Sequence, residues 1–392
     1  MPDILLVATG ETNDDRAVSL MRRTRSSRLE FLDGVRAFAA VWVVLSHIWI
    51  TWNGIRANDG LLGILTNWLL YSHFAVDIFI VLSGFCLTLP RLKFNPNDGS
   101  GALTFFKRRV WRILPPYYCA LAVAIIVHAV LSAGGRTGIN MRDVAQNIFL
   151  LQDIAPASNH FDSPLWSVAV EWRIYFLFPV LWFVINARGA VACLTMSALL
   201  ACLLTFTVLH WAPQAFMSSP WYVFLFTCGM ASAMWASHGT HLRRERLSWG
   251  IVVLFGTLGL GITSFHPVTA FGGSDFGIYM PIIDVCLGIA TSAFLAALTG
   301  QSIVSVNIVR LLSQDPIVYL GTISYSIYLV HSIVLSICWR IVHSLPKYLV
   351  GGDEQMLARF VLLSIGTVFV ASVSFYRAIE SKSIDRSRMV IR

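Results

Sequence analysis

Residues 190–211 read AVACLTMSALLACLLTFTVLHW and contain no Asp, Glu, Lys or Arg. A run of this length and composition is close to the roughly 20 apolar residues with which an α-helix crosses a bilayer. Similar runs recur along the chain, whose 392 residues are 56% apolar and 13% charged, whereas soluble domains carry about 25% charged residues. The sequence therefore predicts an all-α fold, a polytopic transmembrane helical bundle, and excludes a soluble globular domain.

The apolar runs predict about ten membrane-spanning helices. The second and ninth are longer than a bilayer requires, so we expect each to tilt, to break or to emerge from the membrane. No internal repeat is visible in the sequence. The predicted spans are 35–52, 62–89, 113–133, 164–186, 190–211, 220–236, 249–265, 278–299, 317–343 and 357–379.

Lys and Arg are distributed unevenly between the loops that join these spans. If the N-terminus is cytoplasmic, the inner segments hold 20 of the 29 basic residues and the outer loops hold 4. This bias predicts cytoplasmic N- and C-termini and a multi-pass protein of the cytoplasmic membrane. The expected domains are a polar, partly disordered tail over 1–28, a transmembrane domain over 29–380 and a basic cytoplasmic tail over 381–392.

Several other classes of protein are disfavoured. The net charge of +8 follows the expected membrane orientation and does not form a nucleic-acid-binding module, so we expect no nucleic-acid partner. The seven cysteines lie in or beside apolar runs without CxxC spacing, which indicates neither a disulfide framework nor a metal site. The apolar run 4–8 is too short for the core of a signal peptide. The longest outer loop, 134–163, suits either part of an acceptor site or a solvated connector.

Ionisable residues inside predicted spans are costly in lipid and are therefore candidates for function. Arg36 and His47 are 11 residues apart in the first span, so on a helix they share one face and are separated by about 16 Å along its axis. A histidine can accept and return a proton near neutral pH, as a general base must. A structural histidine with an arginine that reaches the interface is the alternative interpretation.

Two carboxylates also fall inside predicted spans. Asp77 lies in the second span and Glu171 in the fourth, and each could orient a histidine or form a structural ion pair. The adjacent Ser83-Gly84 pair is interpreted as a close-packing site between helices.

Further polar patterns occur near the predicted membrane surfaces. Arg109 and Arg112 are three residues apart at the inner surface, so both side chains point the same way on a helix. Paired guanidinium groups suit phosphates, although a membrane anchor that contacts lipid headgroups has the same pattern. Ser324, Tyr328 and His331 share one face of the ninth span, which can either line a cavity or bind helices together.

These motifs together resemble the acyltransferase family 3 of integral membrane O-acyltransferases. The resemblance spans roughly residues 29–380 and rests on five motifs in the family's order. They are Arg36 and His47 as R-x10-H, Asp77 to Phe85 as D-x-F-F-x-x-S-G-F with Ile80 for the second Phe, Arg109 and Arg112 as R-x-x-R, Trp166 to Glu171 as W-S-x-x-x-E, and Ser324 to His331 as S-Y-x-x-Y-L-x-H.

The resemblance implies transfer of an acyl group, usually acetyl, from acyl-CoA to a hydroxyl group. The acceptor is expected to be a surface or secreted glycan, or in some members a small natural product such as a macrolide. No cofactor is expected to be bound permanently, because acyl-CoA is a co-substrate. Proteins of glycan biosynthesis are further candidate partners besides the bilayer.

The resemblance also implies residue roles. Arg36, Arg109 and Arg112 are expected to bind the phosphates of CoA at the cytoplasmic side, and the pantetheine arm is expected to reach toward His47. The expected catalytic residues are His47, as general base or acyl carrier, with Asp77 or Glu171 to orient it. The expected substrate-binding residues are Trp166, Ser167, Tyr325, Tyr328 and His331. No residue is assigned as the donor to the thioester oxyanion, and Arg173 is a candidate cation for a succinyl donor.

The sequence departs from the family pattern near its end. Many members end the last span with Ile-Glu-x-Pro, where this chain has Ile379-Glu380-Ser381-Lys382. We expect the change to affect the geometry of the tail. Some members also carry an extracytoplasmic esterase-like domain after the last span, so a chain that ends here is expected to act alone or to pass its acyl group to a separate protein.

Two other classes of function remain open at this stage. A proton-coupled transporter or flippase could use His47, Asp77 and Glu171 as a proton relay, although no inverted repeat is visible. A non-catalytic scaffold of a glycan-synthesis complex would leave the buried histidine and carboxylates without a purpose. Thioester cleavage by the purified protein would separate an acyltransferase from both.

Overall fold

The computed structural model describes residues 13–55, 57–92, 101–132, 139–155, 161, 164–237, 242–265, 274–345 and 352–390. Within these ranges all regular structure is helical and no strand occurs, which confirms the predicted all-α fold. The helix α1 begins inside the predicted polar tail, at residue 13, and residues 1–12 of that tail lie outside the described ranges.

The helices follow one another without an intervening domain. The long ones are α1 (Asn13–Asn53), α3 (His73–Arg91), α4 (Ala102–Ser132), α6 (Leu165–Trp211), α7 (Tyr222–Ser237), α8 (Leu242–Phe265), α9 (Ser274–Leu298), α12 (Ser324–Ser344) and α14 (Asp353–Phe375). The short ones are α2 (Gly60–Thr66), η1 (Asn67–Leu70), α5 (Met141–Ile148), η2 (Pro213–Ser218), α10 (Ile303–Leu312), α11 (Asp315–Thr322), the π-helical segment η3 (Tyr376–Glu380) and α15 (Ser381–Met389).

Each predicted span coincides with a helical segment. Of the described residues, eight helical stretches are long and apolar enough to cross a membrane, and the bent pair α10–α11 would make a ninth. The helix α6 accounts for two predicted spans, because Gly189 has a φ of 84° and breaks its 47 residues into two parts. The helix α7 matches the predicted span 220–236 but has only 16 residues.

One boundary was predicted incorrectly. The stretch 300–316 is not a loop, because it contains α10 and the start of α11. The break expected in the ninth span, 317–343, is confirmed at Ile323, where α11 ends and α12 begins. The irregularity expected in the second span, 62–89, is also confirmed, since α2 and η1 precede α3 there.

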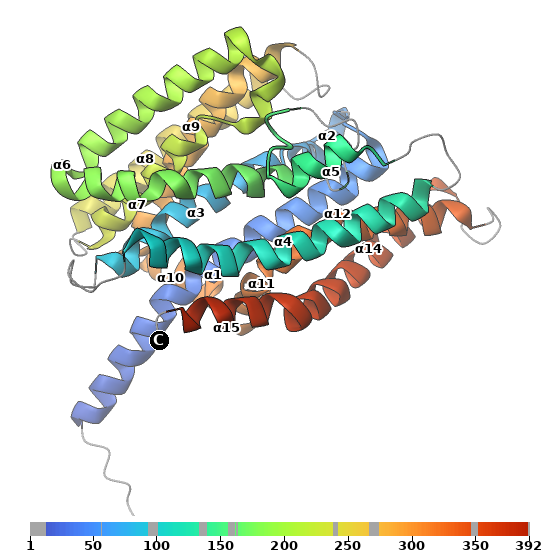
Figure 1. Cartoon of the computed structure of the whole chain (residues 1–392). Helices are drawn as coiled ribbons and strands as arrows, with labels where there is room; N and C mark the ends of the chain where they lie inside the picture. The colour runs from blue at the N-terminus through green and yellow to red at the C-terminus, as the bar shows by residue number, and fades with distance from the viewer. Residues whose placement is uncertain are drawn as a thin grey trace, which may run out of the picture.

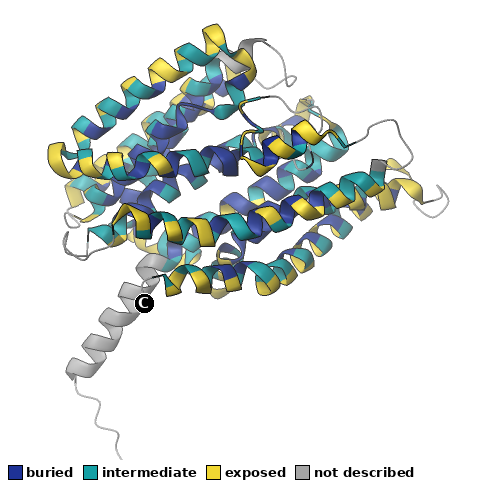
Figure 2. Cartoon of the chain, in the orientation of Figure 1, coloured by how far each residue is buried: buried dark blue, intermediate teal, exposed yellow. Residues whose placement is uncertain are grey.

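The helices form a bundle with α1, α3 and α12 between its two sides (Figure 1). The helices α6 and α8 lie on one side, and α14 and α15 lie on the other. Figure 2 shows that the central helices are largely buried, whereas the outer ones have broad exposed faces. These exposed faces carry large apolar side chains such as Val191 and Phe183, which are 78% and 71% exposed. Lipid is the solvent that suits such a surface.

Small residues bring α3 and α7 into backbone contact. A Cβ atom on Gly84 would lie 2.0 Å from the carbonyl oxygen of Phe226, and one on Gly229 would lie 2.0 Å from that of Val81. Neither position has room for a side chain, so the two helices cross at reciprocal glycines. The structure thus confirms the interpretation of Gly84 as a packing residue, and this crossing fixes the helix that carries Asp77 and Ser83.

The described residues of the segment 134–163, which are 139–155 and 161, pack against the bundle. Its helix α5 buries Asp143 and Asn147, and the backbone carbonyl of Asn147 accepts a 2.7 Å hydrogen bond from the hydroxyl of Tyr117 on α4. The Asp153 carboxylate pairs with the guanidinium of Arg173 on α6. Burial raises the pKa of Asp153, and the hydrogen bond from Arg173 opposes that rise. The described part of this segment is packed, so a purely solvated connector is excluded.

Candidate active site

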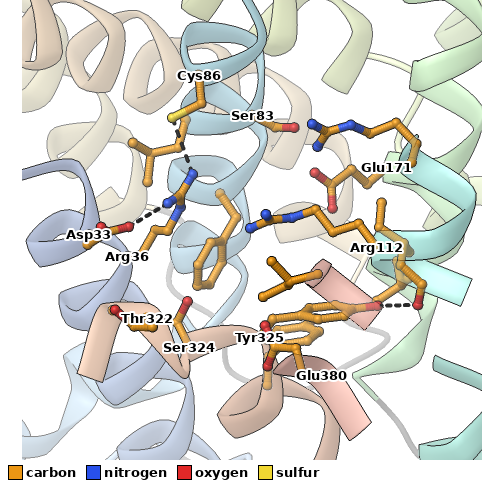
Figure 3. A pocket seen from close by; sticks show the side chains of 18 of the residues that line it. Asp33, Arg36, Ser83, Cys86, Arg112, Glu171, Thr322, Ser324, Tyr325 and Glu380 are labelled. Atoms are coloured by element: carbon orange, nitrogen blue, oxygen red, sulfur yellow. Dashed lines mark hydrogen bonds and ion pairs between the residues drawn. The ribbon is translucent and has the colours of Figure 1, made fainter. Parts of the chain in front are cut away.

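A cavity of about 700 Å³ lies where eight helical segments meet: α1, α3, α4, α6, α11, α12, η3 and α15. Figure 3 shows that Arg36, Arg112, Glu171 and Glu380 are among the charged side chains around it. Residues from 33 to 388 contribute to its wall. The fold thus brings together segments from nearly the whole chain at one site.

The three arginines expected to bind phosphates all line this cavity. Arg36 donates to the Asp33 carboxylate at 2.6 Å and to the Cys86 sulfur at 3.3 Å (Figure 3). Arg109 and Arg112 are one turn apart on α4, and both line the cavity, as their spacing predicts. Among the described side chains, Asp33 is the one carboxylate within ion-pairing distance of these three arginines. The cavity therefore has cationic groups that an anionic ligand could bind.

Glu171 is part of a hydrogen-bonded chain between two helices. The hydroxyl of Tyr175 donates to the Glu171 carboxylate, one turn away on α6. The same hydroxyl lies 2.9 Å from the hydroxyl of Ser83 on α3. All three residues line the cavity, so this series of hydrogen bonds gives the cavity a polar wall that faces the arginines.

A second carboxylate, Glu380, holds the start of α12. It accepts hydrogen bonds from the backbone N–H of Ser326, at 3.1 Å, and from the Ser326 hydroxyl. A carboxylate is stabilised at this position by the unpaired N–H groups and the dipole of a helix N-terminus. Glu380 therefore joins η3 to α12 at the cavity, and the Ile379-Glu380 sequence has a structural role.

Two tyrosines of α12 connect the cavity with its neighbouring helices. The Tyr325 hydroxyl donates to the carbonyl of Ile113 on α4 at 3.1 Å. The Tyr328 hydroxyl donates to the carbonyl of Pro164 at 2.8 Å and lies 2.6 Å from the hydroxyl of Ser167 on α6. Tyr325, Tyr328 and Ser167 all line the cavity, which places three of the expected substrate-binding residues there.

His47 and His331 lie beyond Tyr328 and are not among the cavity-lining residues. Their ring centroids are 4.9 Å apart, and the ring of His331 is 5.9 Å from that of Tyr328. Nδ1 of His47 is 2.8 Å from the carbonyl of Val43, and Nδ1 of His331 is 2.8 Å from the carbonyl of Tyr328. A carbonyl can only accept, so Nδ1 carries the proton in both rings and Nε2 keeps a lone pair.

Neither expected carboxylate orients His47 in the structure. The ring is held by the backbone carbonyl of Val43, while Glu171 accepts a hydrogen bond from Tyr175. Asp77 is fully buried and outside the cavity lining, and neither of its carboxylate oxygens has a hydrogen-bond partner among the described residues, although Tyr222 and Asp284 act on it electrostatically. Its role as a catalytic residue therefore receives no support from a contact with His47.

Asp77 belongs to a separate buried polar cluster on α3, α7 and α9. Asp284 accepts a 2.8 Å hydrogen bond from the indole of Trp221, and its other oxygen is 3.4 Å from Nε2 of His73. Trp166 lies beside this cluster, since its ring is 6.3 Å from that of Tyr222. Trp166 does not line the cavity, so the W-S-x-x-x-E segment is divided between the two sites.

The structure adds cavity residues that the sequence did not single out. Asp33 could have been found from its i, i+3 spacing to Arg36, which is a common ion-pair spacing on helices. Tyr175 could have been found from its position four residues after Glu171. Asp385 and Arg388 line the cavity from α15, and no sequence signal distinguishes them from other charges of the tail. No group of three or more His, Cys, Asp or Glu residues able to hold a metal occurs in the described part of the chain.

Comparison with known proteins identifies relatives over nearly the whole chain. A Staphylococcus aureus protein provisionally named an O-acetyltransferase is 26% identical over 386 residues, which cover 89% of this chain and 56% of the relative. A Bacillus subtilis protein provisionally named a peptidoglycan O-acetyltransferase is 26% identical over 381 residues, covering 88% of this chain and 53% of the relative. The peptidoglycan O-acetyltransferase of Listeria monocytogenes is 23% identical over 385 residues, covering 90% and 57%.

The chain spans little more than half the length of these relatives. No solved structure matches it. The family described as "Acyltransferase domain" matches residues 29–376, a region that contains the three cavity arginines, the two histidines and the cluster around Asp77. The chain therefore belongs to acyltransferase family 3, the family that its five ordered motifs resemble.

Proposed function

We propose that this chain is a membrane O-acyltransferase that moves an acetyl group from cytoplasmic acetyl-CoA to a hydroxyl group of a glycan. The observation that carries the proposal is the cavity, whose lining includes three arginines together with the hydrogen-bonded Tyr328 and Ser167. The histidine pair lies directly behind Tyr328. This arrangement offers a phosphate-binding end and a proton-accepting end for one elongated donor.

The charges of the cavity support an acyl-CoA donor. CoA carries a diphosphate and a 3′-phosphate at one end of a long pantetheine arm, and paired guanidinium groups bind such phosphates through bidentate hydrogen bonds. Arg36 and His47 are separated by about 16 Å along α1, at 1.5 Å per residue. That separation is comparable with the length of the arm, so phosphates at Arg36 and a thioester near His47 are compatible.

His47 is the proposed general base. Its Nδ1 faces the carbonyl of Val43, so Nε2 is free to take the proton from an acceptor hydroxyl. The hydroxyl oxygen then attacks the thioester carbonyl, the C–O bond forms, and the C–S bond breaks. The thiolate of CoA leaves and takes the proton back from His47, so protons and electrons balance without a cofactor.

The acceptor is proposed to reach His47 from the side away from the cavity. His47 is partly exposed as a residue and does not line the cavity, which is compatible with an acceptor that approaches from another direction. Two relatives are named for peptidoglycan, and the same class of acceptor, a glycan outside the cytoplasmic membrane, is proposed for this chain. Transfer would then pass an acyl group across the membrane without moving CoA.

The test is release of CoA from acetyl-CoA by the purified chain in liposomes, with soluble peptidoglycan fragments as acceptor. Wild type is compared with His47→Ala, and loss of a general base is expected to lower the rate by about 10²–10⁴-fold. His210→Ala is the matched control, because His210 is exposed at the end of α6 and its ring stacks on Phe206 at 4.1 Å, away from the cavity. Both variants are first checked for acetyl-CoA binding, which shows that they are folded.

The outcomes discriminate between functions. CoA release that is lost in His47→Ala and kept in His210→Ala supports the proposal. Equal rates in all three proteins would remove His47 from the mechanism. Absence of acetyl-CoA binding by the wild type would reject the acyltransferase and return a proton-coupled carrier to consideration.

A further inference from the structure

The helix α15 (Ser381–Met389) lies beyond residue 376, where the match to the family ends. Four of its residues nonetheless line the cavity: Ser381, Ile384, Asp385 and Arg388. Their spacing of three, four and seven residues places them on one face of a helix. A segment that appears in the sequence as a basic tail therefore forms a wall of the candidate active site.

Contacts on another face of α15 hold it against α4, the helix that carries Arg109 and Arg112. The Ser383 hydroxyl donates to the carbonyl of Trp111, and the Ser387 hydroxyl donates to the carbonyl of Arg108 at 3.0 Å. The guanidinium carbon of Arg386 lies 5.4 Å from the centroid of the Trp111 ring. These three contacts fix the rotation of α15 about its own axis. Packing against α4 therefore turns the other face of α15 toward the cavity.

Lys382, the residue after Ser381, allows α15 to pack against α4. It has a backbone N–H, and the helix continues from α14 through η3 into α15. A proline here would remove a backbone hydrogen bond and would clash with the preceding turn. The family pattern Ile-Glu-x-Pro has a proline at this position. With Lys382 in its place, the helix can continue as α15 to Met389.

The arginines of the cavity differ in depth. The side chain of Arg36 is 27% exposed and that of Arg388 is 78% exposed, while Arg109 and Arg112 are of intermediate exposure. Arg388 therefore lies at the mouth of the cavity. Its only near carboxylate among the described residues is Asp385, at 3.7 Å, a surface pair that contributes little because water and salt screen it.

The less exposed and more exposed arginines correspond to the phosphates along acyl-CoA, the proposed donor. The inference therefore rests on the proposed function. If the pantetheine arm points toward Tyr328, the diphosphate that follows it reaches the deeper arginines. The adenosine and its 3′-phosphate remain at the mouth. We propose that Arg388 binds the 3′-phosphate of acyl-CoA and thereby makes α15 a determinant of donor specificity.

The experiment measures binding of CoA and of 3′-dephospho-CoA to the full-length protein in detergent, by titration calorimetry. Arg388→Ala is expected to weaken CoA binding roughly three- to tenfold, as for loss of one exposed charge-assisted hydrogen bond. The affinity for 3′-dephospho-CoA is expected to be unchanged, because that ligand lacks the phosphate in question. Arg388→Lys is expected to restore part of the affinity, since it keeps the charge and loses the fork.

Lys382→Ala is the matched control. Lys382 is an exposed basic residue on the same helix that does not line the cavity, and alanine keeps the backbone N–H at this position. Its removal changes the net charge equally and is expected to leave both affinities as in the wild type. A general effect of charge would weaken binding equally in both variants.

Three results would overturn the inference. One is an equal loss of affinity for CoA and 3′-dephospho-CoA in Arg388→Ala. Another is an effect of Lys382→Ala as large as that of Arg388→Ala. The third is wild-type protein that binds both ligands with the same affinity. Wild-type protein that binds neither ligand would instead reject the proposed donor itself, so the two failures are distinguishable.

Discussion

Substitution of a single residue, Arg112, tests whether the cavity binds the acyl donor. It lines the cavity beside Arg36 and Arg109, and its guanidinium group is expected to contact donor phosphates that remain unchanged during acyl transfer. Arg112→Ala is therefore expected to raise KM for acetyl-CoA by about tenfold and to leave kcat nearly unchanged, because binding is lost equally in the ground and transition states. Steady-state kinetics at fixed acceptor concentration measures both constants.

The control for this prediction is Arg108→Ala. Arg108 belongs to the same basic run but does not line the cavity, so its KM is expected to stay within about twofold of wild type, as for a surface charge. A large fall in kcat for Arg112→Ala, or an equal KM change in both variants, would contradict a specific phosphate contact.

Tyr328 tests the connection between the cavity and the histidine pair. Its hydroxyl bonds to Pro164 and Ser167, and its ring lies 5.9 Å from that of His331. Tyr328→Phe keeps the ring and removes the hydroxyl, which takes one donor from the Pro164 carbonyl and the hydrogen-bond partner from the Ser167 hydroxyl, and should cost about 1–3 kcal/mol. We expect a fall in kcat of about tenfold with unchanged acetyl-CoA binding, measured by kinetics and calorimetry on the same preparation. Weakened donor binding with normal kcat would place Tyr328 in the donor site only.

The sequence predicted much of the cavity because its residues occur at helical spacings. Arg109 with Arg112, and Tyr325 with Tyr328, each lie on one helix, so their common direction follows from 3.6 residues per turn. The neighbour of Asp77 could not be predicted in this way. Asp284 lies on α9, more than 200 residues away in the chain, and only the order in which helices pack brings the two carboxylates together.

The crossing of α3 and α7 is tested at the scale of the element. Gly84→Ala would place a Cβ atom 2.0 Å from the carbonyl oxygen of Phe226, so the helices would have to separate. Overpacking of this kind costs about 1–3 kcal/mol, and a lower midpoint of thermal unfolding in detergent is expected. Gly256→Ala on α8 is the control, because no atom lies within 4 Å of the added Cβ, and alanine favours a helix by about 0.5–1 kcal/mol. Equal midpoints for the two variants would contradict the close crossing.

The length of the apolar runs in the sequence predicted the long helices but not the short ones. The stretch 303–322 forms α10 and α11, which bend by 64° at a break around Ser313. Neither helix is long enough to produce a membrane-span signal by itself. Their contribution to the cavity, through Gly321 and Thr322, arises from how they fold back against α1, which no local pattern specifies.

At the scale of the whole molecule, the bundle has two chemically different ends. The end with α10 and α15 carries the cavity and its arginines, whereas α2 and α5 lie at the other end (Figure 1). The histidine pair lies between them, along α1 and α12. The proposed transfer from a cytoplasmic donor to an external glycan requires this polarity, and the bias of Lys and Arg predicts which end faces the cytoplasm.

Membrane orientation is tested by cysteine labelling. Arg386→Cys on α15 and Arg142→Cys on α5 are both exposed positions at opposite ends of the bundle. An impermeant maleimide is expected to label Arg142→Cys in intact cells and Arg386→Cys only in inverted vesicles, because the positive-inside bias places α15 in the cytoplasm. The unmodified protein is the control for its own seven cysteines, of which Cys202 is exposed on α6. Labelling of Arg386→Cys in intact cells would reverse the orientation and turn the arginine-lined cavity away from cytoplasmic CoA. Labelling of both positions from one side would contradict the placement of α5 and α15 at opposite membrane surfaces.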